Sequence, residues 1–202
     1  MSGDSELAAP AAPRRSSPAP DAVAVCIVNG RYPRAERVFG GTGAATLFRR
    51  AALDDVAVDG EVFDPRFHTY REDAELAFRL RERGWEVLYE PAAVAEHRRR
   101  VLPERRAILP ARANYNGLKN RYLLRLYHQT AGNFLRTLLP ATFRDGVALA
   151  YVLLAERSSL PAYAWLWRHR RELLARRRAI QGRRMVPPAA IDRWFRVRGL
   201  PL

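Results

Sequence analysis

The sequence has one cysteine, one lysine and no long uninterrupted apolar stretch. The single cysteine, Cys26, excludes a disulfide within the chain and weakly favours a reducing, cytosolic compartment. It lies in the apolar run AVAVCIV, which is more typical of a small buried side chain than of a nucleophile. The longest apolar run, residues 147–155, is too short to cross a bilayer, so we expect no helix to span a membrane unaided.

Several signals of common protein classes are also missing. Asp4, Glu6 and frequent proline argue against a signal peptide, and the Ala-, Pro- and Ser-rich residues 1–21 are predicted to be disordered. No GK[ST] follows the only glycine-rich loop, which excludes a P-loop. There is no helix-turn-helix, zinc-finger or RNA-binding signature. A nucleic-acid-binding role therefore rests on charge alone.

Charge is distributed unevenly along the chain. Residues 1–97 hold 12 Lys/Arg and 16 Asp/Glu, whereas residues 98–202 hold 23 Lys/Arg and 5 Asp/Glu, for a formal net charge of +14 overall. This asymmetry predicts an anionic partner for the second half, either a membrane surface or a nucleic acid. Only Lys119 is a lysine, and the preference for arginine is most simply explained by GC-rich coding.

Apolar periodicity and turn residues predict short alternating elements up to about residue 110. Residues 31–37 are expected to form a polar linker, and Asp59-Gly60 a turn. The glycine-rich loop from Gly40 to Gly43 is predicted to feed a buried strand, although an ordinary tight turn explains it equally. We expect strands at 22–29, 44–48, 85–90 and 93–97, and helices at 50–56 and 72–83.

The remainder of the chain is predicted to be helical, basic and aromatic. Pro140 is expected to separate two of its helices. The predicted segments are 111–128, 133–139, 144–157 and 160–178, with a short basic end at 191–198. We therefore divide the chain into a disordered segment 1–21, an α/β part 22–110, a helical tail 111–182 and a basic end 183–202.

Two adjacent acids, Glu72 and Asp73, lie where an extended segment turns into a helix. The helix dipole and free N–H groups favour the ionised carboxylate there, so such a group can act as general base toward a substrate hydroxyl. Neighbouring side chains diverge, so one acid can take the proton while the other orients the acceptor or ties down a loop. The alternative is that both merely cap the helix. His97 follows a predicted strand, where a solvated histidine is the simpler interpretation.

The runs GGTGAATLFRR and FDPRFHTYREDAELAFRLRERGWEVLYEPAAVAEH together resemble family 2 glycosyltransferases, in particular the rhamnosyltransferase-like branch that builds cell-surface polysaccharides. The resemblance covers about residues 38–125, because Asn114 and 119–122 also look like the helix that follows the catalytic motif. The matching positions are Arg49, Arg50, Phe63, Asp64, Phe67, Tyr70, Glu72, Asp73, Glu75, Leu76, Arg79, Gly84, Trp85, Tyr89, Pro91 and His97.

The resemblance implies part of a GT-A fold followed by a helical basic tail, and an inverting transfer from a nucleotide-sugar to a polysaccharide or lipid-linked acceptor. It assigns Asp73 as general base, with Glu72 positioning the acceptor. It further implies that Gly41, Thr42, Gly43 and Trp85 contact the acceptor. It also implies an Mg²⁺ or Mn²⁺ cofactor, with His97 as a metal or diphosphate ligand, and the cation would act as a Lewis acid.

The sequence departs from the family pattern in several places. His68 stands where Phe is usual, and Ala74-Glu75 where Val-Asp is usual. No Asp-x-Asp precedes Gly41, and residues 1–37 have no room for a donor-binding half. We therefore expect that half to be missing or to come from a partner. The alternatives are a non-catalytic module that binds a lipid-linked sugar and, less favoured, a nucleic-acid-binding protein.

The basic tail also predicts where the protein acts. Arginine-rich helices with Trp165, Trp167 and Trp194 suit an anionic headgroup layer. We therefore expect a cytoplasmic protein bound peripherally to the inner face of the cell membrane. The alternative is that these aromatic side chains pack on the domain while the arginines are solvated.

Overall fold

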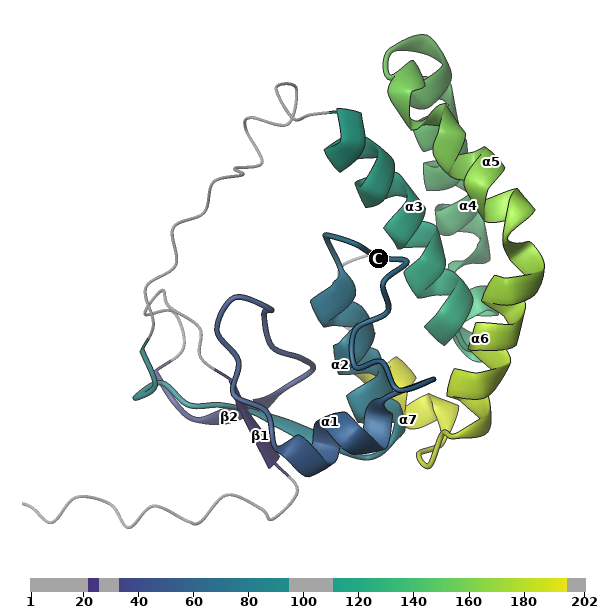
Figure 1. The fold of residues 1–202 in the computed structure, drawn as a ribbon. Coiled ribbons are helices and arrows are strands. Elements are labelled where there is room, and N and C mark those ends of the chain that lie inside the picture. Colours follow the sequence, from purple (N-terminus) through teal and green to yellow (C-terminus); the bar gives the residue numbers. More distant parts are fainter. Residues whose placement is uncertain (1–21, 26–32, 95–110, 196–202) are drawn as a thin grey trace, which may run out of the picture.

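The computed structural model describes residues 22–25, 33–94 and 111–195, which form a mixed α/β protein dominated by helices (Figure 1). The expected disorder of residues 1–21 and the expected role of His97 lie outside the described residues. The strands are β1 (Ala22–Val25), β2 (Glu36–Val38) and β3 (Glu86–Tyr89). The helices are α1 (Arg50–Val56), α2 (Glu72–Glu82), α3 (Ala111–His128), α4 (Ala131–Leu154), α5 (Leu160–Arg168), α6 (Arg170–Gly182) and α7 (Pro188–Asp192), with short 3₁₀ turns η2 (Arg157–Ser159) and η3 (Arg193–Phe195).

The three strands form a small sheet in the order β1-β3-β2, in which β1 is parallel and β2 antiparallel to β3. The strands predicted at 22–29 and 85–90 are confirmed over 22–25 and 86–89, and residues 26–29 lie outside the described residues. Strand β2 replaces part of the predicted polar linker. The predicted strand at 44–48 is wrong. Thr42 there accepts hydrogen bonds from Ala44 N–H and from the Thr46 hydroxyl, and such local bonds compete with a strand ladder. Residues 93 and 94 also lie outside any strand.

Helices α1 and α2 pack together beside the sheet. Their shared cluster contains buried Ala52, Val56, Leu76 and Leu80, with Trp85 packed against it. The stripe on α2 was predicted from the spacing of Leu76, Ala77 and Leu80, and Gly84 ends the region with a φ of 92°. The first turn of α2 is acidic and its last turn basic, as the helix dipole favours.

Residues on both sides of position 110 contribute to a second hydrophobic cluster. Phe67 and Val58 come from the loops around α1, Leu123 and Tyr127 from α3, and the remaining members from α6. Ion pairs reinforce the contact, since Arg66 binds Glu172 on α6 at 2.5 Å. The helical tail is therefore packed on the segment that carries Glu72 and Asp73, rather than extending away from it.

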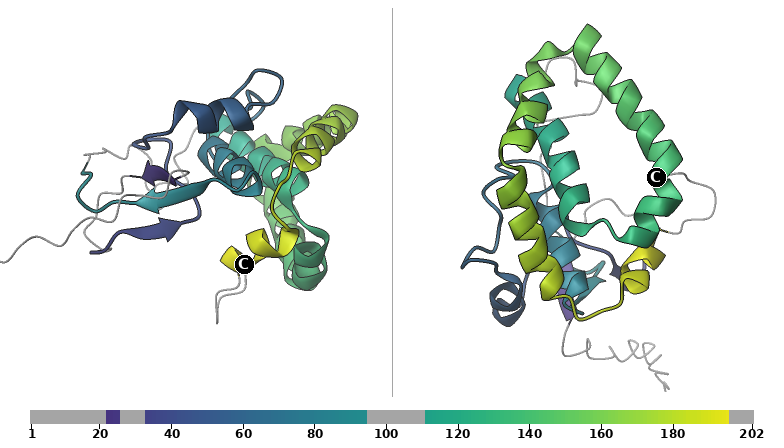
Figure 2. Two further views of the ribbon diagram at one scale, coloured as in Figure 1. Left: turned by 90° about the horizontal axis from the view of Figure 1, so that it is seen from below. Right: turned by 90° about the vertical axis from the view of Figure 1, so that its right-hand side faces the viewer.

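Helix α4 is a single helix of 24 residues, so the prediction of two helices separated by Pro140 is wrong. It begins with Thr130, whose side chain accepts from Asn133 N–H at 3.0 Å. Figure 2 shows α4 running along one flank of the molecule, beside the layer formed by α3, α5 and α6. Only Ala141 and Val152 of α4 are buried. Proline is tolerated where the opened turn faces solvent, because water can bond the freed carbonyl group.

A network of charged side chains is buried between α2, α3 and α6. Arg79 donates two hydrogen bonds to Glu75, at 2.8 and 2.7 Å, and His128 lies between Glu75 and Glu82. Burial alone would lower the pKa of His128, but the two carboxylates outweigh it and raise that pKa above its ordinary value. Burial alone would raise the pKa of Glu75, yet His128 and Arg79 hold it below its usual range. These charges stabilise one another in place of water.

Several arginines bond backbone carbonyl oxygens. Arg81 donates to Phe39 O at 3.0 Å, and Arg176 donates to Val58 O at 3.0 Å, and both side chains are buried. Arg183 is exposed but also donates to the carbonyl oxygens of Ala57 and Asp55. These arginines join loops to helices, and because a carbonyl group is neutral they keep their positive charge.

There is no room for a side chain at Gly40, in the glycine-rich loop. A Cβ atom there would lie 2.3 Å from the Cβ of Ala77 on α2, whereas one at Gly43 would lie 3.5 Å from the Cβ of Asp73. We expect Gly40→Ala to lower the free energy of unfolding by about 1–3 kcal/mol, because neither Cβ can rotate away. Urea unfolding followed by circular dichroism measures this. Gly43→Ala is the matched control, and equal stability of the two variants would contradict the expectation.

Candidate functional site

The first turn of α2 meets the glycine-rich loop. The Oδ2 atom of Asp73 accepts from Gly43 N–H at 3.1 Å, across 30 residues of sequence, and Oδ1 accepts from Ala74 N–H at 2.7 Å. The loop and the acids, predicted separately from the sequence, therefore lie together. Asp73 is half-buried, which leaves its carboxylate within reach of solvent and of a ligand.

A hollow of about 260 Å³ opens beside this contact. Glu72 lines the hollow, and its Oε2 atom is buried without a hydrogen-bond partner among the described residues. Asp64 lines it as well, and its buried Oδ2 likewise accepts no hydrogen bond there, although Arg176 Nε lies 3.5 Å away. Both oxygens have almost no accessible surface, and a buried oxygen that accepts no hydrogen bond is costly, so rotation of either side chain toward the hollow would let a ligand hydroxyl satisfy it. The residues that line the hollow are Gly43, Phe63, Asp64, Pro65, His68 and Glu72.

The backbone that leads into α2 is held in an uncommon conformation. His68, Tyr70 and Arg71 have positive φ angles of 58°, 70° and 68°, although none of them is glycine. Each such residue costs free energy and persists only when its surroundings fix it, and residues of this kind are concentrated at functional sites. The strain ends at Glu72, so it sets the direction in which the two acids leave the loop.

Asn120 of α3 fixes this strained loop. It is fully buried, and its Nδ2 donates to the carbonyl oxygens of Phe67, Thr69 and Tyr70 at 2.8, 2.7 and 2.7 Å. The neighbouring Lys119 donates to Arg66 O at 2.6 Å. Helix α3 therefore positions the acids through the loop, although it does not carry them.

We expect Asn120→Ala to lower the free energy of unfolding by about 1–3 kcal/mol, because it leaves carbonyl oxygens of the strained loop without donors. Amide hydrogen exchange should then speed up in residues 66–74 more than elsewhere. Asn114→Ala is the control, since half-buried Asn114 lies on the same helix and shows no side-chain hydrogen bond to a described residue. Unchanged exchange in the loop of Asn120→Ala would show that the clamp is dispensable.

Of the residues predicted for acceptor binding, the structure brings Gly43 to the acids and leaves Trp85 away from them. Trp85 follows the far end of α2, where its Nε1 donates to Asp55 at 2.8 Å. It therefore supports the packing of α1 on α2. Gly41 and Thr42 lie in the loop beside Gly43, and Thr42 bonds within its own turn. The predicted ligand His97 lies outside the described residues.

Sequence reasoning missed two residues of the hollow as participants. His68, noted only as a departure from the family pattern, lies 2.9 Å through its Nε2 from an Arg112 nitrogen. Asp64, noted only as a motif position, is 2% exposed and binds Arg66 N–H at 3.0 Å. For Asp64, a charged residue within the aromatic stretch FDPRF was a signal in the sequence that could have indicated a site residue. For His68, nothing in the sequence indicates its contact with α3.

The predicted divalent cation requires a set of ligating side chains. Within the described ranges, no group of three or more His, Cys, Asp or Glu side chains is placed to hold a metal ion. The residues that the structure describes therefore do not form a ligand set for Mg²⁺ or Mn²⁺ by themselves. We assign no catalytic step to a cation.

No protein-family model, curated protein or solved structure matches the chain. The resemblance to family 2 glycosyltransferases therefore depends on the quoted motif residues alone.

Proposed function

We propose that this chain provides the acceptor-binding and general-base part of an inverting glycosyl-transfer site of GT-A type. One observation carries the proposal. Asp73 at the start of α2 accepts from the glycine loop, and the adjacent Glu72 lines the hollow and has a buried carboxylate oxygen without a hydrogen-bond partner among the described residues. A sugar hydroxyl needs an acceptor for its proton and further groups to orient it, and this arrangement offers both.

In the proposed reaction Asp73 takes the proton of the acceptor hydroxyl as its oxygen attacks the anomeric carbon of the donor sugar. The bond from that carbon to the nucleotide diphosphate breaks as the new bond forms, which inverts the configuration. Glu72 orients the acceptor by accepting a second hydrogen bond at its unpartnered Oε2. The Gly43 N–H fixes the Asp73 carboxylate and leaves a lone pair on the same oxygen.

The nucleotide-sugar donor, the Mg²⁺ or Mn²⁺ ion and the role of His97 remain predictions from the resemblance. The described sheet has three strands, and no nucleotide-binding half is found within the described ranges. We therefore propose that donor binding requires residues beyond those described, or a partner protein.

A second candidate function is a sugar-binding accessory module without catalysis. It is favoured by the bonding of Asp73, since each of its oxygens already accepts a backbone N–H. A carboxylate bonded in this way can have a purely structural role, which is to hold the loop. Under this alternative the hollow binds a saccharide, and no bond is made or broken.

Transfer assays with the full chain separate the two candidates. The chain is incubated with a panel of nucleotide-sugars, MnCl₂ and bacterial membranes, which supply both lipid acceptors and a partner protein. Release of nucleoside diphosphate and formation of labelled lipid are measured. Acceptor-dependent release that Asp73→Asn removes supports the enzyme. Saccharide binding by saturation-transfer NMR, equal in wild type and Asp73→Asn and without release from any donor, supports the accessory module and contradicts the enzyme.

A further inference from the structure

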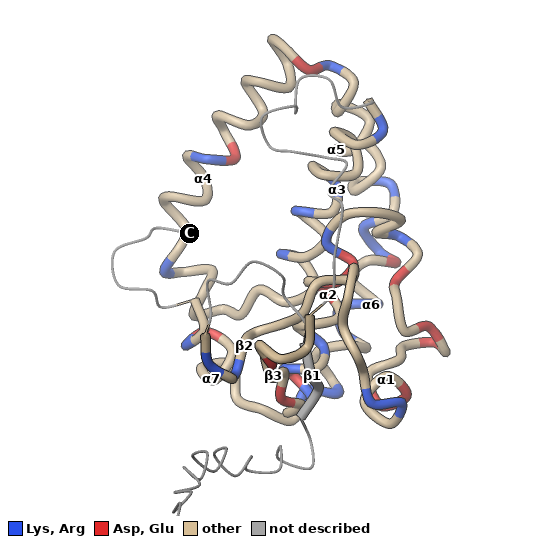
Figure 3. The backbone as a smooth tube through the Cα atoms, turned by 90° about the vertical axis from the view of Figure 1, so that its left-hand side faces the viewer, with Lys and Arg blue, Asp and Glu red and all other residues tan. Residues whose placement is uncertain are grey.

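Helix α4 exposes an apolar surface along most of its length. Its large side chains at solvent positions include Leu139, Phe143 and Leu154, which are 81%, 76% and 84% exposed. By length and composition α4 is the one helix of the described residues apolar enough to cross a membrane. A search of the sequence for uninterrupted apolar runs does not identify α4 as such a helix, because Arg144 and Asp145 interrupt its apolar residues. Figure 3 shows these two charges near the middle of a helix that is otherwise mostly uncharged.

The positive charges on and beside α4 face solvent, whereas the negative charge within it does not. Arg136, Arg144 and Arg157 are exposed, whereas Asp145 is half-buried and bonded by Arg121 and Arg125 of α3. An apolar face bordered by exposed arginines complements a bilayer with anionic headgroups, where the arginine stems lie along the apolar region and the guanidinium groups reach phosphate.

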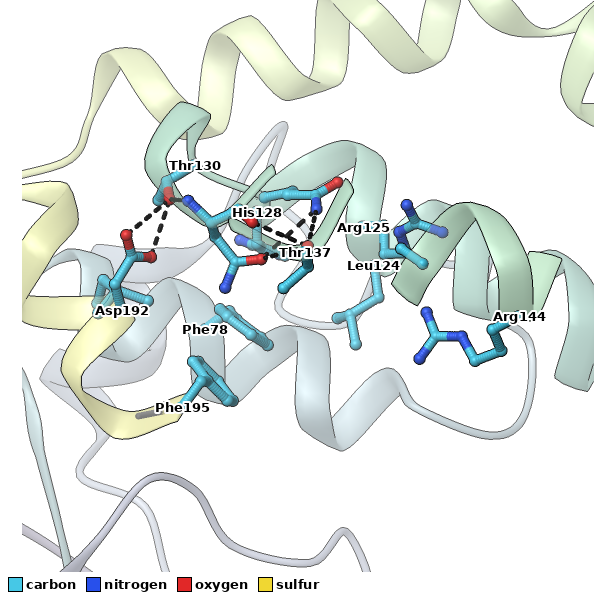
Figure 4. A pocket seen from close by; sticks show the side chains of 13 residues that line it. Phe78, Leu124, Arg125, His128, Thr130, Thr137, Arg144, Asp192 and Phe195 are labelled. Carbon is cyan, nitrogen blue, oxygen red and sulfur yellow. Dashed lines mark hydrogen bonds between the residues drawn. The ribbon is translucent and has the colours of Figure 1, made fainter. Parts of the chain in front are cut away.

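The start and the middle of α4 are attached to the rest of the protein. At its start the Thr130 hydroxyl bonds Asp192 of α7 at 2.8 and 3.0 Å, beside an apolar cavity of about 220 Å³ (Figure 4). At its middle Asp145 is bonded to α3. If α4 crossed a bilayer, this ionic cluster would enter the hydrocarbon region, which is strongly unfavourable. The attachments therefore favour a helix that lies parallel to the membrane.

We propose that α4 is an in-plane membrane helix, whose outer apolar face enters the headgroup–acyl boundary of an anionic bilayer. The proposal differs from the membrane contact expected from the tail tryptophans. Trp165 stacks on His169, and Trp194 lies under Arg81, while Trp167 is the most exposed of these three, at 69%. The proposal is independent of glycosyl transfer, because it rests on α4 and its anchors alone.

Vesicle flotation tests membrane binding. Wild-type protein should float with phosphatidylglycerol-containing vesicles and bind at least tenfold less to phosphatidylcholine vesicles. The variant Leu139→Asp/Phe143→Asp should lose about tenfold or more of its affinity, since both apolar side chains leave the bilayer. Leu47→Asp is the control, because Leu47 is 73% exposed but lies outside α4. Unchanged flotation of the α4 variant, or no flotation of wild type, overturns the proposal.

The orientation is tested separately with an environment-sensitive fluorophore on single cysteines, in a Cys26→Ser background. Labels at the outer positions Leu139, Phe143 and Val147 should shift to the blue with vesicles, and a label at Ala148 should not. A shift at all four positions indicates a spanning helix and overturns the in-plane arrangement. A dimer in sedimentation analysis that Leu139→Asp/Phe143→Asp separates, without vesicle binding, assigns this face to a second copy and also overturns the proposal.

Discussion

Asp73→Asn is expected to slow acceptor-dependent sugar transfer by about 10²- to 10⁴-fold, the usual contribution of a general base. Asparagine matches aspartate in shape, and its carbonyl oxygen can still accept the Gly43 N–H, which keeps the loop contact. Its NH₂ group then faces the Ala74 N–H, so one hydrogen bond in the first turn of α2 is lost. The change removes the negative charge that accepts the proton. We therefore expect kcat to fall while the KM for the acceptor changes little.

The matched variant is Glu72→Gln, which should mainly raise the KM for the acceptor, because Glu72 is proposed to orient the hydroxyl. Circular dichroism and thermal unfolding check that both variants remain folded. A larger loss of kcat in Glu72→Gln than in Asp73→Asn would transfer the base role to Glu72, whose Oε2 has no partner among the described residues. Wild-type kcat in both would remove the pair from catalysis.

Arg79→Met should cause the largest loss of stability, about 3–5 kcal/mol in the free energy of unfolding. Arg79 is 2% exposed, and its guanidinium group also donates to Val56 O and Val62 O. Methionine fills similar space but leaves Glu75, which is fully buried, without its bidentate partner. Most of the expected loss of stability comes from leaving the Glu75 carboxylate buried without Arg79, rather than from losing the attraction within the ion pair.

Urea unfolding at pH 7 measures this loss, with Arg50→Met as the control. Arg50 forms a pair with Asp54, but its side chain is 87% exposed, so its removal should change stability by about 0.5 kcal/mol or less. The double variant Glu75→Gln/Arg79→Met should recover part of the loss, because it removes the buried carboxylate charge that Arg79 no longer balances and that His128 alone then faces. A single-variant loss below about 1 kcal/mol would show that the surroundings replace Arg79.

Local signals were sufficient for the helices and strands with clear boundaries. Helix α3 was predicted with its observed ends, although Gly117 and three asparagines within it are poor helix formers. Helix α4 was divided wrongly at Pro140, since the cost of an interior proline depends on whether solvent reaches the opened turn. The strand β2 was missed because its three residues, Glu36, Arg37 and Val38, give no strand pattern by themselves and pair with β3.

The candidate site could be predicted only in part. The sequence and the resemblance indicated Glu72, Asp73 and the glycine loop, and the structure brings them together at Gly43. The clamp by Asn120 could not be predicted, because it depends on how α3 packs against a loop some 50 residues earlier. The position of Trp85 likewise depended on its packing against Asp55, which no periodicity in the sequence indicates.

The arginines that bond carbonyl oxygens also change the meaning of the missing lysines. A guanidinium group is a planar fork that can hold two acceptors at once, as Arg183 does between Ala57 and Asp55, whereas an ammonium group is a compact, strongly hydrated charge. Replacing these arginines by lysine would preserve the formal net charge at pH 7, but an ammonium group could not span the same pair of carbonyl oxygens. Coding composition explains the frequency of arginine, whereas these contacts give particular arginines a role in joining loops.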